Sequence, residues 1–244
     1  MAHTRETRAF ASEIKFVVEP ALAERLRAWA REHLDPDPHG GGPHGDAYTT
    51  TSLYFDTPDL DVFVRNGSYG RAKYRVRRYA DGRVVFLERK LRTKRLLAKR
   101  RTVVPLEDLA WLEAEARPGE NWPGLWMARR LAARSLAPVC QVSYARMARM
   151  ADTPSGPARL TLDDGIRATS VDGLGFSDAA GTPVLPDVQI LELKFRTHLP
   201  GIFKQLVEEF RLEPQTASKY RLAMGSLGAA PAGAAASTMT EAGA

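Results

Sequence analysis

The sequence predicts an α+β fold in which an antiparallel β-barrel, or a mostly antiparallel sheet, carries helices packed on its outside. Many strand-like runs follow one another with only a few helical runs between them, an order typical of this class. Several of the runs also alternate apolar and charged side chains, so each would turn one apolar face towards helices. The chain has 244 residues, of which 44% are hydrophobic and 26% charged, enough apolar material for a single large domain.

The predicted elements cover most of the chain. Residues 11–18 alternate as a strand, and residues 20–33 are predicted to be helical. In this helix Leu22, Leu26 and Trp29 recur at helical spacing. Further strands are predicted at residues 48–57, 96–104, 139–150, 158–169 and 187–195, with a hairpin at 71–90. Further helices are predicted at residues 105–117, 125–136, 200–212 and 216–224, with a short helical piece within 57–68.

The ends of the chain and its cysteine content indicate one cytoplasmic domain. Residues 1–224 are expected to fold together, and the Ala- and Gly-rich residues 225–244 to form a disordered tail. No apolar run approaches the roughly 20 residues of a membrane-spanning helix, and the N-terminus has no apolar secretory segment. The single cysteine, Cys140, cannot form an internal disulfide, which is consistent with a reducing cytoplasm.

Basic residues are concentrated in one segment. Of the 35 Lys and Arg residues in the chain, 14 lie between positions 71 and 101, together with only two of the 29 Asp and Glu residues. The remainder of the chain is therefore acidic, although the whole chain has a net charge of +6. Such a concentration predicts a polyanionic ligand, and at this point nucleic acid, an anionic membrane and a phosphate chain all remain open.

Residues 71–90 are predicted to form a hairpin whose charged side chains share one face. Asp81 and Gly82 are a typical turn pair, and a two-residue or a four-residue loop gives the same strand register. Because side chains alternate along a strand, the register decides which of them lie together. The shared face is expected to carry Lys73, Arg75, Arg77, Glu88 and Lys90, with Arg75 opposite Glu88, Lys73 opposite Lys90 and Arg77 opposite Phe86.

The same inversion recurs in other strands. The triplet Glu-x-Lys occurs at residues 13–15, 88–90 and 192–194, each time inside an alternating strand. Several strands that are apolar outside and charged inside predict a barrel with a polar lumen. Unpaired like charges in such a lumen would repel one another, so a ligand is expected there. Cations would bind phosphates, and carboxylates would bind a divalent metal ion.

Nine short stretches, taken in order, identify the family that the chain resembles. They are EIKFVV, SLYFDT, KYRVRRY, VFLERK, KRR at 99–101, SYAR, LTLDD, LELKF and QTASKY. No single stretch is specific. Together, over residues 12–224, they resemble the VTC domain, the polyphosphate polymerase branch of the triphosphate tunnel metalloenzyme (CYTH-like) superfamily.

The resemblance implies a fold, an activity and a set of ligands. The barrel would form a triphosphate tunnel, and the activity would be transfer of the ATP γ-phosphate onto a growing inorganic polyphosphate chain. The cofactor would be a divalent metal ion, Mn²⁺ or Mg²⁺. Expected partners are ATP, polyphosphate, and orthophosphate or pyrophosphate. No nucleic acid is expected, and coupling to a membrane would need a separate membrane-protein partner.

The resemblance also implies roles for individual residues. Expected catalytic residues are Arg75, Arg77, Lys90, Glu192 and Lys219, and Glu192 is also the expected metal ligand. Expected substrate-binding residues are Lys15, Lys73, Lys99, Arg100, Arg101, Tyr144, Arg146, Lys194 and Ser218. Arg100 and Arg101 are alternatives to Lys99 at one position. Glu88 has the alternative role of orienting Arg75.

Two further hypotheses remain open. A hydrolase of triphosphate or tripolyphosphate would share the fold, but such enzymes usually begin with Glu-x-Glu-x-Lys, whereas this chain has Ala11 at the first position. The loss of one carboxylate fits the polymerase branch better. A non-catalytic protein that binds polyphosphate or RNA would use the same basic segment, but it leaves Glu192 unexplained.

Overall fold

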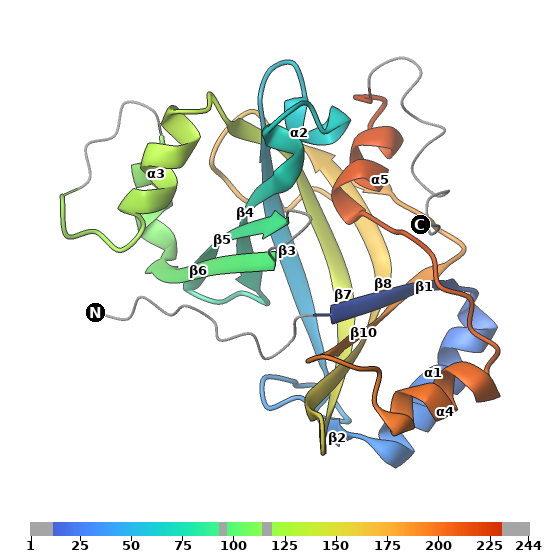
Figure 1. Ribbon diagram of the computed structural model, residues 1–244. Coiled ribbons are helices and arrows are strands. Elements are labelled where there is room, and N and C mark those ends of the chain that lie inside the picture. The colour runs from blue at the N-terminus through green and yellow to red at the C-terminus, as the bar shows by residue number, and fades with distance from the viewer. Residues whose placement is uncertain (1–11, 93–96, 114–118, 231–244) are drawn as a thin grey trace.

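A computed structural model of the chain describes residues 12–92, 97–113 and 119–230 (Figure 1). Ala11 and residues 231–244 of the predicted tail lie outside the described residues. Among the described residues, no helix is both long and apolar enough to cross a membrane.

Ten strands form one antiparallel sheet. Along its main path they lie in the order β1–β10–β8–β7–β3–β4–β5–β6, while β2 pairs with β7 and β9 pairs with β8. The bounds are β1 Ser12–Val18, β2 Asp35–Pro36, β3 Ala47–Asp56, β4 Ala72–Tyr79, β5 Val84–Arg92, β6 Leu97–Pro105, β7 Ala137–Thr153, β8 Gly156–Ser170, β9 Thr182–Pro183 and β10 Gln189–Phe195.

The predicted hairpin and its register are confirmed. In the β4–β5 ladder Lys73 pairs with Lys90, Arg75 with Glu88 and Arg77 with Phe86. The strands are joined by residues 80–83, and the amide of Gly82 donates a hydrogen bond to the carbonyl oxygen of Tyr79. The charged positions of the two strands therefore share one face, as the alternation predicts.

The sheet is curled as in the predicted barrel, but in the described residues backbone hydrogen bonds do not close it. β1 and β6 are the terminal strands, and the described residues contain no ladder between them. Nevertheless Lys90 on β5 forms an ion pair with Glu13 on β1, which requires the two ends of the sheet to approach each other. Long side chains, and not backbone hydrogen bonds, bridge this gap. We call the face that carries Lys90 and Glu13 the inner face.

Helices cover the outer face in two groups. α1 (Pro20–His33) and α4 (Gly201–Glu209) pack on β1, β10 and β8 through an apolar cluster that includes Leu26, Phe203 and Leu160. On the other half, α3 (Leu125–Ala132) and the 3-10 helix η2 (Leu106–Leu112) accompany β5 and β6 (Figure 1). The short helix α2 (Asp61–Val64), with the 3-10 helix η1 (Tyr69–Arg71) beside it, packs its Phe63 against the ring of Tyr220. The predicted helix 105–117 is thus 3-10 where it is described, and residues 114–118 lie outside the described part.

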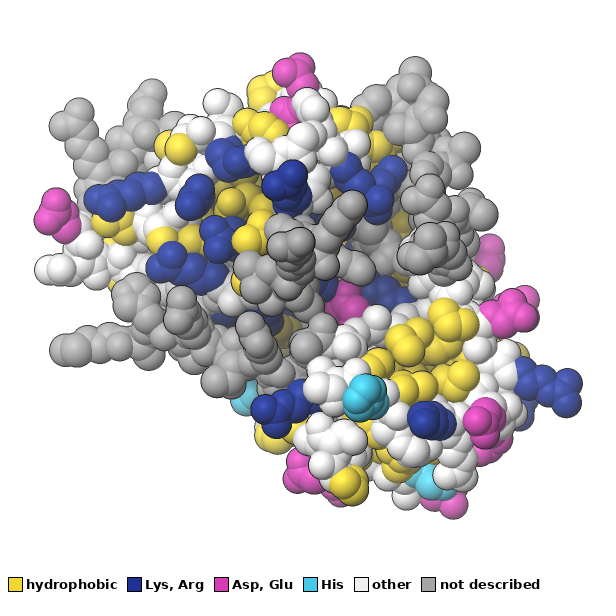
Figure 2. Space-filling view, viewed as in Figure 1, with side chains coloured by type: hydrophobic (Ala, Val, Ile, Leu, Met, Phe, Trp, Pro, Cys, Tyr) yellow, Lys and Arg dark blue, Asp and Glu magenta, His cyan; other side chains and the backbone are white. Residues whose placement is uncertain are grey.

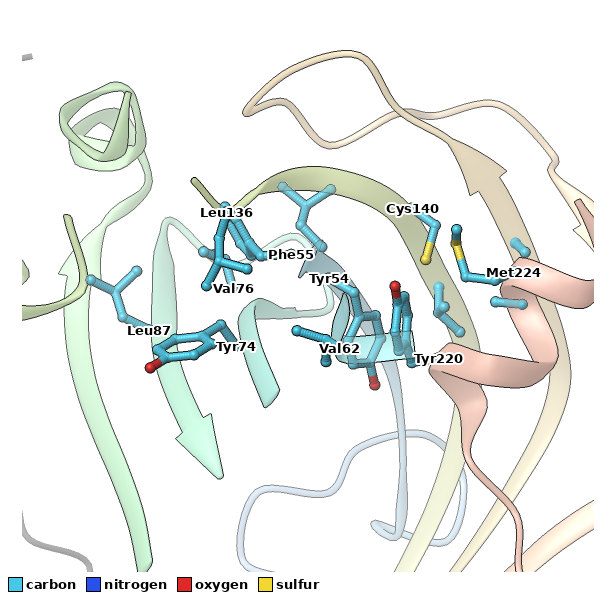
Figure 3. Packing of buried hydrophobic residues seen from close by; sticks show 14 of the residues in the cluster. Tyr54, Phe55, Val62, Tyr74, Val76, Leu87, Leu136, Cys140, Tyr220 and Met224 are labelled. Atoms are coloured by element: carbon cyan, nitrogen blue, oxygen red, sulfur yellow. The ribbon is translucent and has the colours of Figure 1, made fainter. Parts of the chain in front are cut away.

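The last helix, α5 (Lys219–Ser226), covers one end of the inner face. The rings of Tyr54 on β3 and Tyr220 on α5 stack with their centroids 5.3 Å apart, and Met224 lies beside Cys140 on β7 (Figure 3). α5 begins three residues later than predicted. The chain before it is extended, and the amide of Gln215 donates to the carbonyl oxygen of Lys15 at 2.8 Å. This segment and α5 together close that end of the inner face.

Candidate phosphate-binding site

The inner face brings together charged and hydroxyl side chains from eight strands. Register places on it Glu13 and Lys15 (β1), Glu192 and Lys194 (β10), Thr161 and Asp163 (β8), Tyr144 and Arg146 (β7), Ser52 and Tyr54 (β3), Lys73, Arg75 and Arg77 (β4), Glu88 and Lys90 (β5), and Lys99 and Arg101 (β6). Ser218 and Lys219 join them from the start of α5. Lys and Arg side chains also gather on the surface over β4–β6 (Figure 2).

Glu88 on β5 holds cations of its two neighbouring strands, β4 and β6. It is 3% exposed, its Oε2 accepts a hydrogen bond from Arg75 Nε at 2.5 Å, and its Oε1 lies 3.3 Å from Arg101 Nε and 3.5 Å from Lys99 Nζ. Burial alone would raise the pKa of Glu88, but these cations and Arg77 hold it well below its usual range. Glu88 is therefore ionised at neutral pH, and it fixes the directions of the surrounding cations, as expected for Arg75.

Arg77 is held by hydroxyl groups of two other strands. Its Nε donates to Ser52 Oγ at 3.0 Å and its Nη2 donates to Tyr144 OH at 3.1 Å. The residue is 5% exposed, and among the described residues no carboxylate forms an ion pair with it. A buried charge without a counter-ion is costly unless a ligand compensates it. Arg77 is therefore a buried cation of the inner face that an anion would compensate.

A second buried charged group of the inner face lies on β7 and β8. Arg146 donates two hydrogen bonds to Asp163, from Nε to Oδ1 at 2.6 Å and from Nη2 to Oδ2 at 2.7 Å. Lys219 Nζ lies 2.6 Å from the same Oδ2. Burial would raise the pKa of Asp163, but Arg146 and Lys219 hold it well below its usual range. Two cations thus share one carboxylate, which leaves a positive excess.

Glu192 is the candidate metal ligand. Its Oε2 lies 2.9 Å from Lys194 Nζ and its Oε1 lies 3.7 Å from Lys15 Nζ, while Lys15 also lies 3.8 Å from Glu13. The described residues contain no group of three or more His, Cys, Asp and Glu side chains that could hold a metal ion by themselves. Mg²⁺ commonly takes only one or two carboxylates and completes its shell with phosphates and water. Glu192 fits a metal ion that arrives with the substrate.

Lys73 lies where α5 meets the inner face. Its Nζ donates a hydrogen bond to Ser218 Oγ at 2.9 Å. Burial, followed by repulsion from Lys15, Arg65 and other nearby cations, lowers the pKa of Lys73 to about 7. An anion bound here would restore the charge of the ammonium group. The structure thus brings together two predicted substrate-binding residues, Lys73 and Ser218, that are far apart in the sequence.

Arg100 is a correction to the predicted set. It pairs with Arg89 across β5 and β6, one position out of phase with Lys99 and Arg101, so its side chain lies on the outer face. There its guanidinium lies over the ring of Trp126, 4.3 Å from the centroid. Of the three alternatives in the KRR stretch, Lys99 and Arg101 therefore lie on the inner face and Arg100 does not.

The sequence analysis missed the contribution of β3. Ser52 and Tyr54 alternate on its inner side and contact Arg77 and Arg75 respectively, with Tyr54 OH 3.4 Å from Arg75 Nη1. The Thr- and aromatic-rich composition of this strand concealed the pattern, because neither face is charged. The alternation of hydroxyl side chains in TTTSLY was the available signal.

Comparisons with known proteins give the following matches. The family model described as the VTC domain matches residues 10–228. A comparison with curated proteins finds no match. A solved structure of a proposed adenylate cyclase from Bacillus halodurans gives a TM-score of 0.54 at 16% identity, covering 84% of this chain and 92% of that chain. A proposed adenylyl cyclase from Hippeastrum is described as having a dominant triphosphatase activity. Its structure gives a TM-score of 0.49 at 15% identity, covering 87% of this chain and 94% of that chain. The first likeness shows a shared fold.

Proposed function

The chain belongs to the VTC domain family, and on this premise we propose that it is a polyphosphate polymerase that transfers the ATP γ-phosphate onto a growing inorganic polyphosphate chain. The observation that carries the proposal is the buried guanidinium of Arg77, held by Ser52 and Tyr144 without an ion-pair partner among the described residues. It lies on a face lined by further cations. Such a face suits the phosphates of a nucleotide and of a polyphosphate chain together.

The reaction needs positioning and charge neutralisation more than covalent participation by the protein. Arg75 and Arg77 project from alternate positions of β4, and Arg146 projects from β7, two strands along the sheet. Guanidinium groups bind phosphate oxygens in pairs, so they fix the direction of the chain as well as its charge. Lys90 and Lys219 add point charges on either side.

The metal ion of the proposal, Mn²⁺ or Mg²⁺, would be held by Glu192 together with phosphate oxygens of the substrate. When bound, it would neutralise charge that develops on the transferred phosphoryl group. Lys15 and Lys194 hold the Glu192 carboxylate in place before substrate arrives.

Transfer to a phosphate acceptor fits the three buried carboxylates of the inner face better than transfer to water does. Glu88, Asp163 and Glu192 are all buried, and neighbouring cations lower the pKa of each. A general base works best with a pKa near the working pH, so none of the three is suited to deprotonate water. The end of a polyphosphate chain, or orthophosphate or pyrophosphate at initiation, is already anionic and needs no protein base.

The test is incubation of the purified protein with ATP and Mn²⁺. The proposal predicts long polyphosphate, and predicts that Glu192→Gln abolishes it while tripolyphosphate still binds. Orthophosphate released from tripolyphosphate, without chain growth, would identify the hydrolase of the same fold. If neither product forms and ATP does not bind, the polymerase proposal is wrong.

A matched pair of variants tests the role of the buried Arg77 guanidinium. Arg77→Gln should abolish chain growth, whereas Arg78→Gln should leave it near the wild-type rate. Arg78 is the next residue on β4, but its guanidinium lies on the outer face over Phe176, 4.8 Å from the ring centroid. Equal losses in both variants would show that the inner guanidinium has no special role.

A further inference from the structure

Along the inner face of β4, β5 and β6 the side chains change from charged to apolar. From Lys73 to Arg77 its positions carry charge, but beyond Arg77 and Arg101 they become aromatic and aliphatic. The ladders place Phe86 opposite Arg77 and Val103 opposite Phe86. We call Tyr79, Val84, Phe86 and Val103 the aromatic end of the inner face.

The aromatic end is accessible, although its side chains are apolar. Val84 is 43% exposed and Val103 is 50% exposed, and they are two of only four large hydrophobic residues exposed among those described. Tyr79 and Phe86 beside them are half-buried. An exposed apolar patch bordered by polar groups is typical of a ligand-binding surface, whereas isolated exposed residues are common. Here the exposed residues adjoin a site for anions.

Flat groups are already stacked at this end. The rings of Tyr79 and Phe86 meet edge to face at 5.2 Å, and Tyr48 meets Tyr79 in the same manner at 5.6 Å. The guanidinium of Arg101 lies over the Phe86 ring, 3.8 Å from its centroid, and its Nη2 donates to Tyr79 OH at 3.0 Å. Aromatic rings and guanidinium planes are the groups on which proteins stack nucleobases.

The spacing suits a nucleotide whose phosphates bind the charged part of the wall. Arg77 and Arg75 lie two and four positions before Tyr79 on β4, about 7 and 14 Å along the strand. This is the range over which a nucleoside triphosphate extends from its base to its phosphates. At the opposite end, Lys73 contacts Ser218 and Lys15 contacts the carbonyl oxygen of Ala217, so the chain before α5 already covers that side.

We propose that the aromatic end is the nucleobase subsite for a nucleoside triphosphate whose phosphates bind Arg75 and Arg77. This inference rests on the proposed function, because it takes the inner face to be the phosphate site. It adds the direction in which the substrate lies, with the base at the aromatic end and the terminal phosphate towards Ser218 and Lys219. It also makes a nucleotide, and not inorganic triphosphate, the ligand that uses the whole site.

Two probes separate the base from the phosphates. Calorimetry would measure the dissociation constants of a non-hydrolysable ATP analogue and of inorganic tripolyphosphate for the whole protein. Phe86→Ala and Val103→Ser should each weaken binding of the analogue, by about tenfold for Phe86→Ala, the usual effect of losing one stacked ring. Neither should change tripolyphosphate binding by more than about twofold, because the phosphates do not reach the aromatic end.

Val64→Ser is the matched control. Val64 is 45% exposed, similar to the 50% of Val103, but it lies on α2 and not on β4, β5 or β6, so its variant should bind both probes as the wild type does. Phe86→Ala also removes a contact of Arg101, and a loss of tripolyphosphate binding would reveal such a side effect. Val103→Ser, at an exposed position, tests the subsite without that complication.

Each outcome decides one of the two proposals. Selective loss of analogue binding supports the nucleobase subsite. Equal changes for both probes in Val103→Ser, or no change in either variant, overturn the subsite and leave the proposed function standing. If the wild-type protein binds neither probe, the phosphate site itself is wrong, and the proposed function falls together with the subsite.

Discussion

Lys90 on β5 and Glu13 on β1 form an ion pair, with Nζ 2.6 Å from Oε1, although the two strands lie near opposite ends of the sheet order. The contact joins the two sides of the curled sheet across its inner face. Lys90 is also one of the expected phosphate-binding residues. A phosphate that binds Lys90 must therefore compete with Glu13, and the same pair both bridges the sheet and restrains the site.

Glu13→Gln is accordingly expected to strengthen tripolyphosphate binding in the absence of divalent metal, by up to about fivefold. The side chains of this pair are 42% and 28% exposed, and an ion pair of this kind contributes about 0 to 1 kcal/mol. For the same reason the free energy of unfolding should change by less than about 1 kcal/mol. Calorimetry and urea unfolding measure the two quantities. Weaker binding by Glu13→Gln without metal would contradict competition for Lys90.

Protein stability is expected to fall on acidification below about pH 4, the ordinary pKa of carboxyl groups in unfolded chains. In the folded protein the pKa values of Asp163 and Glu88 are well below that value. Their ionised forms therefore stabilise the fold fully above the unfolded pKa, and this contribution is lost as the pH falls towards the folded pKa. Urea unfolding at pH 7, 5 and 3 measures the loss.

The variant Asp163→Asn isolates one of these carboxylates. At pH 7 it should lower the free energy of unfolding by about 3 to 5 kcal/mol, because it leaves Arg146 and Lys219 buried without their partner. Its stability should then depend less on pH between 5 and 3 than that of the wild type. An unchanged pH dependence would show that Asp163 is not the group that titrates.

Side-chain alternation was sufficient to predict which residues share the inner face of the hairpin. The Asp81–Gly82 turn sets the register, and the register alone places Arg75 beside Glu88. The same reasoning was not available for β6, because no turn signal fixes its phase relative to β5. For this reason the sequence leaves Lys99, Arg100 and Arg101 as alternatives, and the β5–β6 ladder separates them.

Curvature and pairing across the sheet lay beyond sequence reasoning. Alternation reports the face of each residue, but closure depends on twist accumulated over many strands. The sequence therefore predicted the polar inner face of a curled antiparallel sheet, but not that the described strands leave it open between β1 and β6. The contact between Lys73 and Ser218 depends in addition on the extended segment before α5, where the sequence predicted helix from residue 216.

Tripolyphosphate binding is expected to depend on pH through Lys73. Burial, and then Lys15, Arg65, Lys90 and Arg221, lower the pKa of its ammonium group to about 7, so it loses its charge as the pH rises through neutrality. In Lys73→Arg the charge persists. The ratio of wild-type to variant affinity should therefore fall by up to about tenfold between pH 6 and pH 8.

The ratio of the two affinities cancels the titration of the ligand, which is the same for both proteins. It also cancels the titration of Lys194, which both proteins contain and whose pKa is lowered by burial to about 8. The stability of the ligand-free protein changes with pH in the opposite direction to its affinity for tripolyphosphate. The unfolded chain binds the proton of Lys73 more tightly, so unfolding becomes less favourable as the pH rises from about 7. A ratio that stays constant with pH would show that Lys73 does not contact the ligand.

Tyr220→Phe is expected to lower the free energy of unfolding by about 1.5 to 3 kcal/mol, the usual loss for a hydrogen bond to a charged group. Tyr220 OH donates to Asp56 Oδ2 at 2.5 Å, and the same carboxylate accepts from the amides of Thr57, Val62 and Phe63. Tyr69→Phe is the control, because Tyr69 OH lies 3.5 Å from its partner carbonyl. Similar losses in both variants, measured by urea unfolding, would contradict a special role for Asp56 in anchoring α5.

Adjacent arginines on β6 give the sharpest comparison of the two faces of the sheet. Arg101→Gln should weaken tripolyphosphate binding by about tenfold or more, because it removes a charged donor from the inner face. Arg100→Gln should change the binding by less than about twofold, since its guanidinium lies over Trp126 on the outer face. The two substitutions remove the same charge from neighbouring positions, so general electrostatic attraction would weaken both variants alike. Calorimetry at two salt concentrations separates that result from a local contact at Arg101, which alone would make the two variants differ.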